Sequence, residues 1–306
     1  MNPQKKLLAC VVALTTFVCT FGQITIVDDA MTGTNNAAGR QAAPSSTRVQ
    51  WFMGGNYSST YGSGSLNVTN ASAQVLGYFT AAGSPVQLAV GETLTATFTF
   101  KMTGLPGGTT ADGQLRFGLL NSDTGTNSPN RISADVFSAN NQFLGYTGYA
   151  AMMRVNPNAT GNLALFERTN MTNNTLIGSS APYTSLASTA FQALANNTFY
   201  TGTFSATRTG ASALTMGYSM TGGSLTSYAT SYSDASALTT AFDSFAINWA
   251  TGTMNSGTFT LDSFSATVTA APIPEPSTYA AFAGVAALGL VILRRRSQRS
   301  CRTAGV

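Results

Sequence analysis

The stretch TLTATFTFKMT, residues 93–103, alternates between polar and apolar side chains without interruption. Successive side chains of a β-strand point to opposite faces, so this alternation separates the residues into two sides. Threonine is β-branched and suits the open face of a strand. The stretch therefore predicts a half-buried strand whose threonines and Lys101 face solvent. The side predicted to face a core holds Leu94, Ala96, Phe98, Phe100 and Met102.

Similar strand signals recur along the chain, separated by turns rich in Gly, Asn and Ser. Residues 199–208 and 213–220 flank a short turn at Gly210, which predicts a hairpin. Only residues 185–195 show a weak helical period. The chain is therefore predicted to be all-β, with one antiparallel two-sheet sandwich over residues 23–270 rather than two small domains. Further predicted strands are 49–53, 74–80, 114–120, 147–155, 162–168, 245–249 and 258–268.

The charged residues are few and unevenly placed. The formal net charge is +4, but residues 23–273 hold eight of the fifteen basic residues and ten of the eleven acidic ones, a balance of −2. The basic excess thus belongs to the two ends, which argues against a nucleic-acid partner. Charged residues make up only 8% of the chain, and Thr, Ser, Asn and Gly fill the polar positions, as in an extracellular β-protein. The 18 Phe and 11 Tyr argue against a disordered chain.

The N-terminus has the pattern of a secretory signal peptide, predicted over residues 1–22. Lys5 and Lys6 precede an apolar run, and Thr20 and Gly22 are small residues before a cut at Gln23. An uncleaved membrane anchor is the alternative, although the apolar run is short for a membrane span. The three cysteines, Cys10, Cys19 and Cys301, all lie outside the body, which therefore has no internal disulfide.

The C-terminal region combines prolines, an apolar run and arginines. Residues 279–293 are apolar and would form a helix of about 22 Å, which is short against a hydrocarbon core of about 30 Å. They predict one marginal transmembrane helix after a proline-rich linker, with a permanent single span as the alternative to a removable anchor. The arginines Arg294, Arg295 and Arg296 follow directly and place the C-terminus in the cytoplasm.

Residues 271–306 resemble the PEP-CTERM sorting signal of exopolysaccharide-producing Gram-negative bacteria. The resemblance rests on Pro274, Glu275, Pro276 and Ser277, followed by the apolar run and the three arginines. It implies recognition and cleavage near Pro274–Pro276 by an exosortase, a membrane-embedded protease. The precursor would be anchored in the inner membrane before the body reaches the cell surface or the extracellular matrix. The body's activity is not implied, because such signals follow many unrelated domains.

The order of segments in the body resembles that of concanavalin-A-like and laminin-G-like jelly rolls. Residues 27–29 open the body, residues 115–119 lie in the middle and residues 259–264 close it. The resemblance implies that the first and last strands pair, in a fold whose members often bind sugars. An inference of function from fold alone is an association.

The sequence lacks the residues that most hydrolytic sites need. There is no histidine, which excludes a Ser-His-Asp or Cys-His site, and the body offers no cysteine or histidine for zinc. Glycoside hydrolysis requires two carboxylates, and the body has only two glutamates, Glu92 and Glu167. Glu92 fits a solvated turn, while Glu167 either points into a groove or pairs with an arginine at the surface. A pair of aspartates from separate strands stays open.

Two kinds of ligand-binding residue remain as candidates. Asp28, Asp29 and Asp262 would meet if the terminal strands pair, and could bind Ca²⁺; the alternative is that they cap backbone N–H groups. Aromatic rings could stack on sugars, and Trp51 and Tyr57 are placed near a loop. The alternative for Trp51 is a position in the core. Trp249 is expected to lie in the core. The other aromatic candidates are Tyr61, Tyr146 and Tyr149.

The sequence as a whole predicts an exported, non-catalytic protein that contacts extracellular polysaccharide. Trp51, Tyr57 and Glu167 are the candidate ligand contacts, and no cofactor other than Ca²⁺ is expected. The alternatives are a polysaccharide hydrolase or lyase, and a self-associating structural protein of the cell surface.

Overall fold

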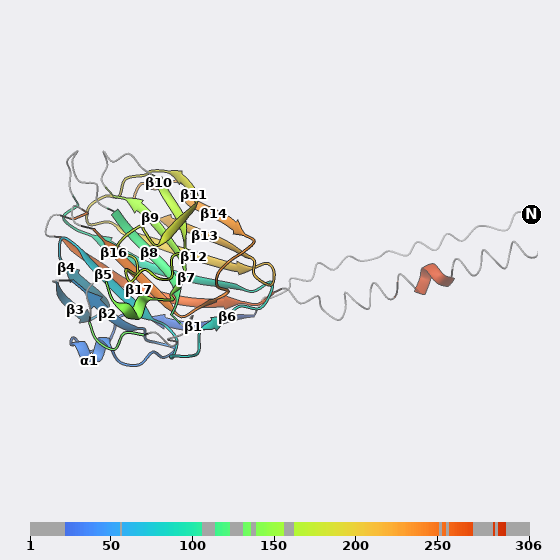
Figure 1. The fold of residues 1–306 in the computed structure, drawn as a ribbon, viewed down its shortest axis with the longest axis horizontal. Helices are drawn as coiled ribbons and strands as arrows, with labels where there is room; N and C mark the ends of the chain where they lie inside the picture. Colours follow the sequence, from blue (N-terminus) through green and yellow to red (C-terminus); the bar gives the residue numbers. More distant parts are fainter. Residues whose placement is uncertain are drawn as a thin grey trace, which may run out of the picture. The chain divides into compact units, whose positions relative to one another are not determined.

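The chain divides into two units. The computed structural model describes residues 22–55, 57–105, 114–122, 131–135, 139–155, 162–250, 253–254, 257–271, 284 and 287–291. One compact unit is Gln23–Ala271, and the other combines the terminal segments Met1–Gly22 and Pro272–Val306. The first unit holds all the named strands and is a sandwich of antiparallel sheets (Figure 1).

An eight-stranded sheet forms one layer. Its strands follow the order β14-β13-β12-β7-β17-β4-β3, and β1 also pairs with β17. Every pair is antiparallel. The strands are β1 (Gln23–Asp29), β3 (Ser58–Gly62), β4 (Ser65–Thr69), β7 (Thr93–Met102), β12 (Phe199–Arg208), β13 (Leu214–Thr221), β14 (Tyr228–Asp234) and β17 (Thr258–Thr269).

A seven-stranded sheet forms the other layer, in the order β11-β10-β9-β8-β16-β5-β2. Its strands are β2 (Gln50–Gly54), β5 (Ala73–Tyr78), β8 (Gln114–Asn121), β9 (Thr147–Arg154), β10 (Asn162–Arg168), β11 (Tyr183–Ala190) and β16 (Ser244–Trp249). The short strands β6 (Val86–Gln87) and β15 (Ala241–Phe242) pair separately. The named helices are the one-turn α1 (Ala37–Arg40) and the 3-10 turn η1 (Asn141–Phe143).

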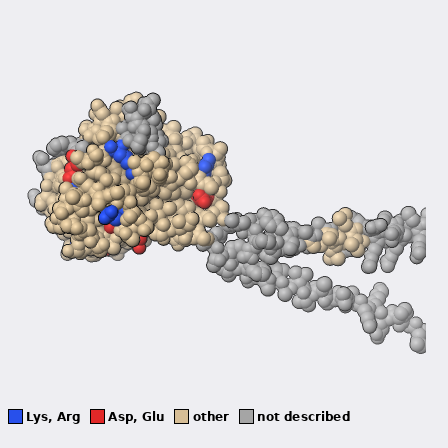
Figure 2. All heavy atoms as spheres, turned by 90° about the horizontal axis from the view of Figure 1, so that it is seen from below, with Lys and Arg blue, Asp and Glu red and all other residues tan. Residues whose placement is uncertain are grey.

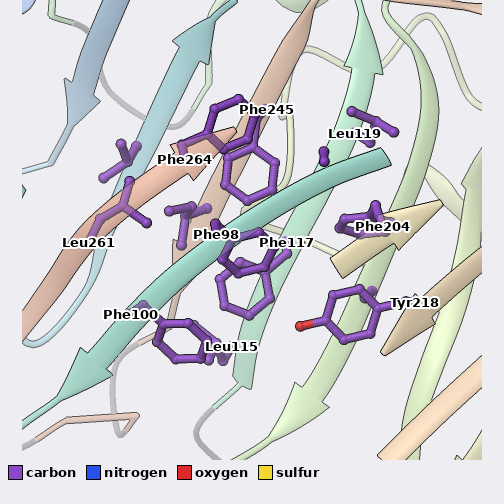
Figure 3. Packing of buried hydrophobic residues seen from close by; sticks show 14 of the residues in the cluster. Phe98, Phe100, Leu115, Phe117, Leu119, Phe204, Tyr218, Phe245, Leu261 and Phe264 are labelled. Atoms are coloured by element: carbon purple, nitrogen blue, oxygen red, sulfur yellow. The ribbon is translucent and has the colours of Figure 1, made fainter. Parts of the chain in front are cut away.

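The strand predicted from residues 93–103 is confirmed as β7, at the centre of the eight-stranded sheet. It pairs with β12 on one side and with β17 on the other. Its apolar side faces the core between the sheets, where the Phe98 ring lies 4.6 Å from that of Phe117 and 4.7 Å from that of Phe245, centroid to centroid. Figure 3 shows these rings between strands of the two sheets.

Two further predictions about strand pairing are confirmed. β12 and β13 form an antiparallel hairpin around Gly210. β1 pairs with β17, so the first and last strands of the body lie side by side. The weak helical prediction for residues 185–195 is wrong, because these residues begin within strand β11. Hydrogen bonding to β10 along its whole length overrides the local preference there.

Loops cover part of the outer face of the seven-stranded sheet and enclose a second apolar cluster. Arg168, fully buried in β10, donates to the carbonyl oxygens of five loop residues: Phe143, Tyr146, Asn170, Asn173 and Thr175. The cluster beneath the loops contains Phe52, Leu76, Tyr78, Leu120, Ile132, Phe143, Tyr146, Ala150, Met152, Leu176, Ile177, Tyr183 and Ala246.

Most of the two terminal segments lies outside the described residues. This applies to the predicted signal peptide, to the prolines and Glu275 of the sorting signal and to Arg294, Arg295 and Arg296. Within the predicted transmembrane helix 279–293, Gly284 and residues 287–291 are described and are helical. No helix in the described ranges is long and apolar enough to cross a membrane. The sorting signal and its anchor therefore stay predictions.

Candidate functional site

A row of large polar side chains lies on the outer face of the seven-stranded sheet, beside the loop cover. Gln74, Asn248 and Arg116 occupy adjacent positions on β5, β16 and β8, as the strand register shows. Their sequence neighbours, such as Phe117 and Ile247, point to the opposite side and belong to the core between the sheets. We call Gln74, Asn248 and Arg116 the polar row.

The polar row is buried yet incompletely hydrogen-bonded. Arg116 donates to Asn248 Oδ1 (3.3 Å), to the Ile177 carbonyl (3.1 Å) and to Gln114 Oε1. Its Nε and the Oε1 of Gln74 are buried without a hydrogen-bond partner. An unsatisfied buried polar atom costs about 1–3 kcal/mol. The row thus holds one donor and one acceptor without a partner, both below the surface of the sheet.

Electrostatics around Arg116 also favours a polar partner. Burial lowers the pKa of this guanidinium, the Tyr183 hydroxyl opposes that shift, and the nearby Arg154 lowers the pKa further. Within the described ranges, Arg116 forms no ion pair. Its hydrogen bonds go to neutral oxygens. Arg116 is therefore held by oriented hydrogen bonds to neutral oxygens rather than by an ion pair with a carboxylate.

A groove of about 320 Å³ adjoins the polar row. This volume lies at the lower end of the range for ligand pockets, about 300–1,000 Å³. Amide and guanidinium groups at its rim can bond hydroxyls, and the Phe166 ring offers an apolar wall. The groove is lined by Gln114, Met152, Met153, Arg154, Asn162, Ala164, Phe166 and Ser180.

The structure places Trp51 and Tyr57 away from any ligand surface. Trp51 is fully buried in the core, and its indole N–H donates to the Asp29 carboxylate (2.9 Å). Tyr57 donates to Asp135 (2.5 Å), which also pairs with Arg40. Burial and the Asp135 carboxylate raise the pKa of Tyr57 to about 12. The prediction that Trp51 contacts ligand is therefore wrong, and Tyr57 serves to hold a loop.

The remaining aromatic candidates are internal. Tyr61, Tyr146 and Tyr149 are at most 3% exposed, so they offer no platform for sugar stacking. Trp249 is fully buried, as expected for a core residue. These side chains fill the sandwich because alternate strand positions point inward.

Glu167 faces away from the groove. Phe166 and Ala164 of β10 line the groove, whereas Glu167 is buried and accepts from the Leu238 N–H (3.0 Å). Near it, the Tyr149 hydroxyl donates to Asp234 (2.8 Å). Burial raises the pKa of Glu167, the Leu238 N–H lowers it, and the Asp234 carboxylate raises it. Neither predicted position of Glu167, in a groove or in a surface ion pair, is observed.

The three candidate calcium-binding aspartates differ in their surroundings. Asp29 is buried and accepts three hydrogen bonds, from the N–H groups of Met31 and Val49 and from Trp51. Asp28 and Asp262 are exposed. No group of three or more His, Cys, Asp or Glu able to hold a metal occurs among the described residues. Asp29 instead plays the alternative role of capping backbone N–H groups.

The sequence reasoning missed the polar row. A signal was present, because Arg116 stands alone in the otherwise apolar stretch LRFGLL, residues 115–120. A charged residue inside a buried strand needs partners, which marks the position as unusual. Gln74 and Asn248 gave no such signal, because which polar residues become neighbours depends on how β5, β16 and β8 pair.

Comparison with known proteins leaves the family open. No family model matches the chain, and no curated protein matches it. Similar solved structures include basic winged bean lectin with Tn-antigen (14% identity, 81% of this chain and 98% of that chain, TM-score 0.43). Others are peanut lectin with a nine-residue peptide (12%, 81% and 97%, 0.44) and a protein of unknown function from Shewanella oneidensis MR-1 (13%, 85% and 92%, 0.42). The assignment to an antiparallel β-sandwich rests on the strand pairing itself.

Proposed function

We propose that the protein is an exported, non-catalytic binding protein that contacts extracellular polysaccharide through the groove beside the polar row. The observation that carries this proposal is the groove itself, where the amides of Gln114 and Asn162 lie beside the aromatic wall of Phe166. Sugars present hydroxyls that both donate and accept, and apolar ring faces that pack on aromatic side chains. Pairing of the first and last strands supports a jelly-roll arrangement of the sandwich.

A titration with exopolysaccharide from the source organism tests the proposal. Gln114→Ala removes an amide at the groove rim, and the expected loss of affinity is about fivefold to tenfold, or about 1 kcal/mol for one hydrogen bond. Gln87→Ala, in the short strand β6, is the matched control and should bind like the parent. The titration is run with and without Ca²⁺, so that a contribution of Asp28 and Asp262 through a bound cation would be detected.

Release of reducing ends is measured in the same samples. Saturable binding without new reducing ends supports the proposal. New reducing ends would contradict the non-catalytic reading and favour a hydrolase, and a lyase is detected by the unsaturated sugar it releases. Absence of saturable binding would overturn the proposal and favour a self-associating surface protein.

We further propose that residues 271–306 act as an exosortase-processed sorting signal. The order Pro274–Pro276, apolar run, Arg294–Arg296 supports it. Replacing all three arginines by Gln should leave an unprocessed precursor in the membrane fraction, seen as a larger band on immunoblots. The matched control replaces Arg299 and Arg302 by Gln and should be processed normally. Normal processing of the triple variant would contradict the proposal.

A further inference from the structure

The outer face of the eight-stranded sheet carries hydroxyl side chains in register across five neighbouring strands, β17, β7, β12, β13 and β14. Four rows run across these strands, and the fourth does not reach β14. Together we call them the hydroxyl face, in which Gly217 and Ala229 are the two positions without a hydroxyl. The first row is Thr269, Thr93, Thr207, Thr215 and Ser233, and the second is Thr267, Thr95, Ser205, Gly217 and Ser231. The third row is Ser265, Thr97, Thr203, Ser219 and Ala229, and the fourth is Ser263, Thr99, Thr201 and Thr221.

The hydroxyl face is regular and contains no charged residue. Neighbouring strands lie about 4.8 Å apart and alternate residues along a strand about 6.7 Å apart, so hydroxyls repeat in two directions. An ordinary protein draws about a quarter of its residues from charged types. Charged residues are also sparse elsewhere: on the side of the body drawn in Figure 2 they form small, separate spots among uncharged residues. The face is therefore suited to an uncharged partner.

The hydroxyl face is hollowed at one side. A groove of about 510 Å³ lies over β12, β13 and β14, and residues of β11 complete its wall. Its volume falls within the range of ligand pockets. Hydroxyl, glycine and alanine positions dominate its lining: Ala187, Ser188, Thr189, Thr203, Ser205, Gly217, Tyr218, Ser219, Ala229, Thr230 and Ser231.

An exposed aromatic ring continues the hydroxyl face beyond its fourth row. Phe199 lies on the same side of β12 as Thr201 and is 47% exposed. Lys101 of β7 lies opposite it, with its ammonium group 4.9 Å from the ring centroid. An exposed ring next to an array of hydroxyls offers the apolar and polar contacts that the two faces and edges of a sugar ring require.

Each contact on such a face is weak. A hydroxyl–hydroxyl bond contributes a net of about 0.5–1.5 kcal/mol, and a short ligand must offset its loss of freedom on binding. A polymer with a regular repeat makes many such contacts at once, and its successive contacts are effectively intramolecular. The hydroxyl face thus favours long chains over short oligosaccharides.

We propose that the hydroxyl face is a second binding surface, for an uncharged polysaccharide chain, on the opposite sheet from the polar row. This inference rests on the proposed function, because it takes contact with extracellular polysaccharide as given and adds a surface and a ligand class. Polyanions are disfavoured, since the four rows contain no cationic side chain and Lys101 lies only at their border. Two opposed surfaces would let one molecule join two chains.

The test uses the full chain and the neutral part of the source organism's exopolysaccharide, separated into size fractions, with the acidic part for comparison. Thr203→Lys and Ser219→Lys place charges on opposed positions inside the groove. Thr47→Lys, in an exposed turn, is the matched control. Affinity of the parent should rise steeply with neutral chain length. The two groove variants should lose at least tenfold for the longest fraction, while the control binds like the parent.

Phe199→Ala provides a second variant if the lysine variants fail to fold, which circular dichroism detects. It should weaken binding of long neutral chains several-fold without changing the melting temperature by more than a few degrees. Light scattering on every variant reports the oligomeric state. A change in oligomeric state without a change in polysaccharide binding would overturn the inference in favour of a second copy as the partner.

The outcomes separate this inference from the proposed function. Binding that Gln114→Ala weakens but that the groove variants and Phe199→Ala leave intact would overturn the hydroxyl face alone. Preference for the acidic fraction would do the same. Failure of the parent to bind any fraction would overturn the proposed function as well.

Discussion

Buried carboxyl groups accept hydrogen bonds that connect parts of this sandwich. Glu167 on β10 and Asp234 on β14 lie where the edges of the two sheets approach each other, and both are less than 9% exposed. Glu167 accepts from Leu238 N–H, and Asp234 accepts from the Tyr149 hydroxyl and from Ser236 N–H. Within the described ranges, no Lys or Arg forms an ion pair with either carboxyl. A second carboxyl nearby, without a cation between them, disfavours the charged form of the buried Glu167.

This arrangement predicts that part of the stability depends on protonation of Glu167. Because burial and Asp234 raise its folded-state pKa above the unfolded value, the folded state holds the proton more tightly. The stabilising contribution is complete below the unfolded pKa, about 4.3, and is lost as pH rises through the raised folded pKa. Glu167→Gln imitates the protonated acid and should lack this loss.

Thermal melts from pH 4 to pH 8 check the prediction. The melting temperatures of parent and variant should be similar near pH 4, and the variant should be the more stable at pH 8. Glu92→Gln, in the turn before β7, is the control and should follow the parent. If the melting temperatures of Glu167→Gln and the parent changed in parallel with pH, the raised pKa of Glu167 would be contradicted.

The pairing of strands β7 and β12 depends on a glycine opposite a phenylalanine. Gly202 of β12 pairs with Phe98 of β7, and a Cβ at position 202 would lie 2.3 Å from the Phe98 ring. The ring cannot easily move, because it packs between Phe117 and Phe245. The two strands therefore fit together only when position 202 has no side chain.

Gly202→Ala should consequently destabilise the protein by about 1–3 kcal/mol, the usual cost of overpacking. Gly217→Ala in the adjacent strand is the matched control. A Cβ there approaches only the Ser205 hydroxyl on the open face, at 2.6 Å, and that side chain can rotate away. Denaturant unfolding should show a clear loss for the first variant and a change within about 0.5 kcal/mol for the second. Equal effects would show that the Phe98 contact is not the cause.

The last strand completes the whole body. β17 pairs with β1, β4 and β7, so residues from both ends and the middle of the body meet along it. It also buries Phe259, Leu261 and Phe264 in the main core. Loss of one large core side chain costs about 2–5 kcal/mol. Loss of three is therefore comparable to the whole free energy of unfolding of a typical protein, about 5–15 kcal/mol.

A chain ending at residue 257 should therefore fail to fold, whereas a chain ending at residue 271 should fold like the parent. The unit Gln23–Ala271 contains every named strand. Circular dichroism during heating should show no cooperative transition for the shorter chain and a normal one for the longer chain. A cooperative transition in the chain lacking β17 would contradict its central role.

Local alternation was enough to predict the inner strands and the core. Residues such as Phe98 and Trp249 lie in segments whose two sides differ sharply in polarity, and the structure confirms both as buried. Strand β4 was not predicted, although Leu66 and Val68 alternate with polar residues in it. Strands β3 and β14 were not predicted either, since Ser, Thr and Tyr make both of their sides look polar. Their pairing partners, rather than their own composition, make them strands.

The strand class and the inward and outward sides of each central strand could be read from the sequence alone, whereas the pairing of the body's first and last strands was implied only by resemblance to jelly-roll domains. The strand class and the two sides did not depend on that resemblance. These follow from side-chain period and from the free energy of burying apolar residues, which are local properties. Which polar residues become neighbours depends instead on how the strands pair in the folded chain. Gln74, Asn248 and Arg116 form one row, and the threonines of β7 align with those of β12, because register joins segments that are far apart in the chain. Register is a property of pairs of strands, and a single strand does not encode it.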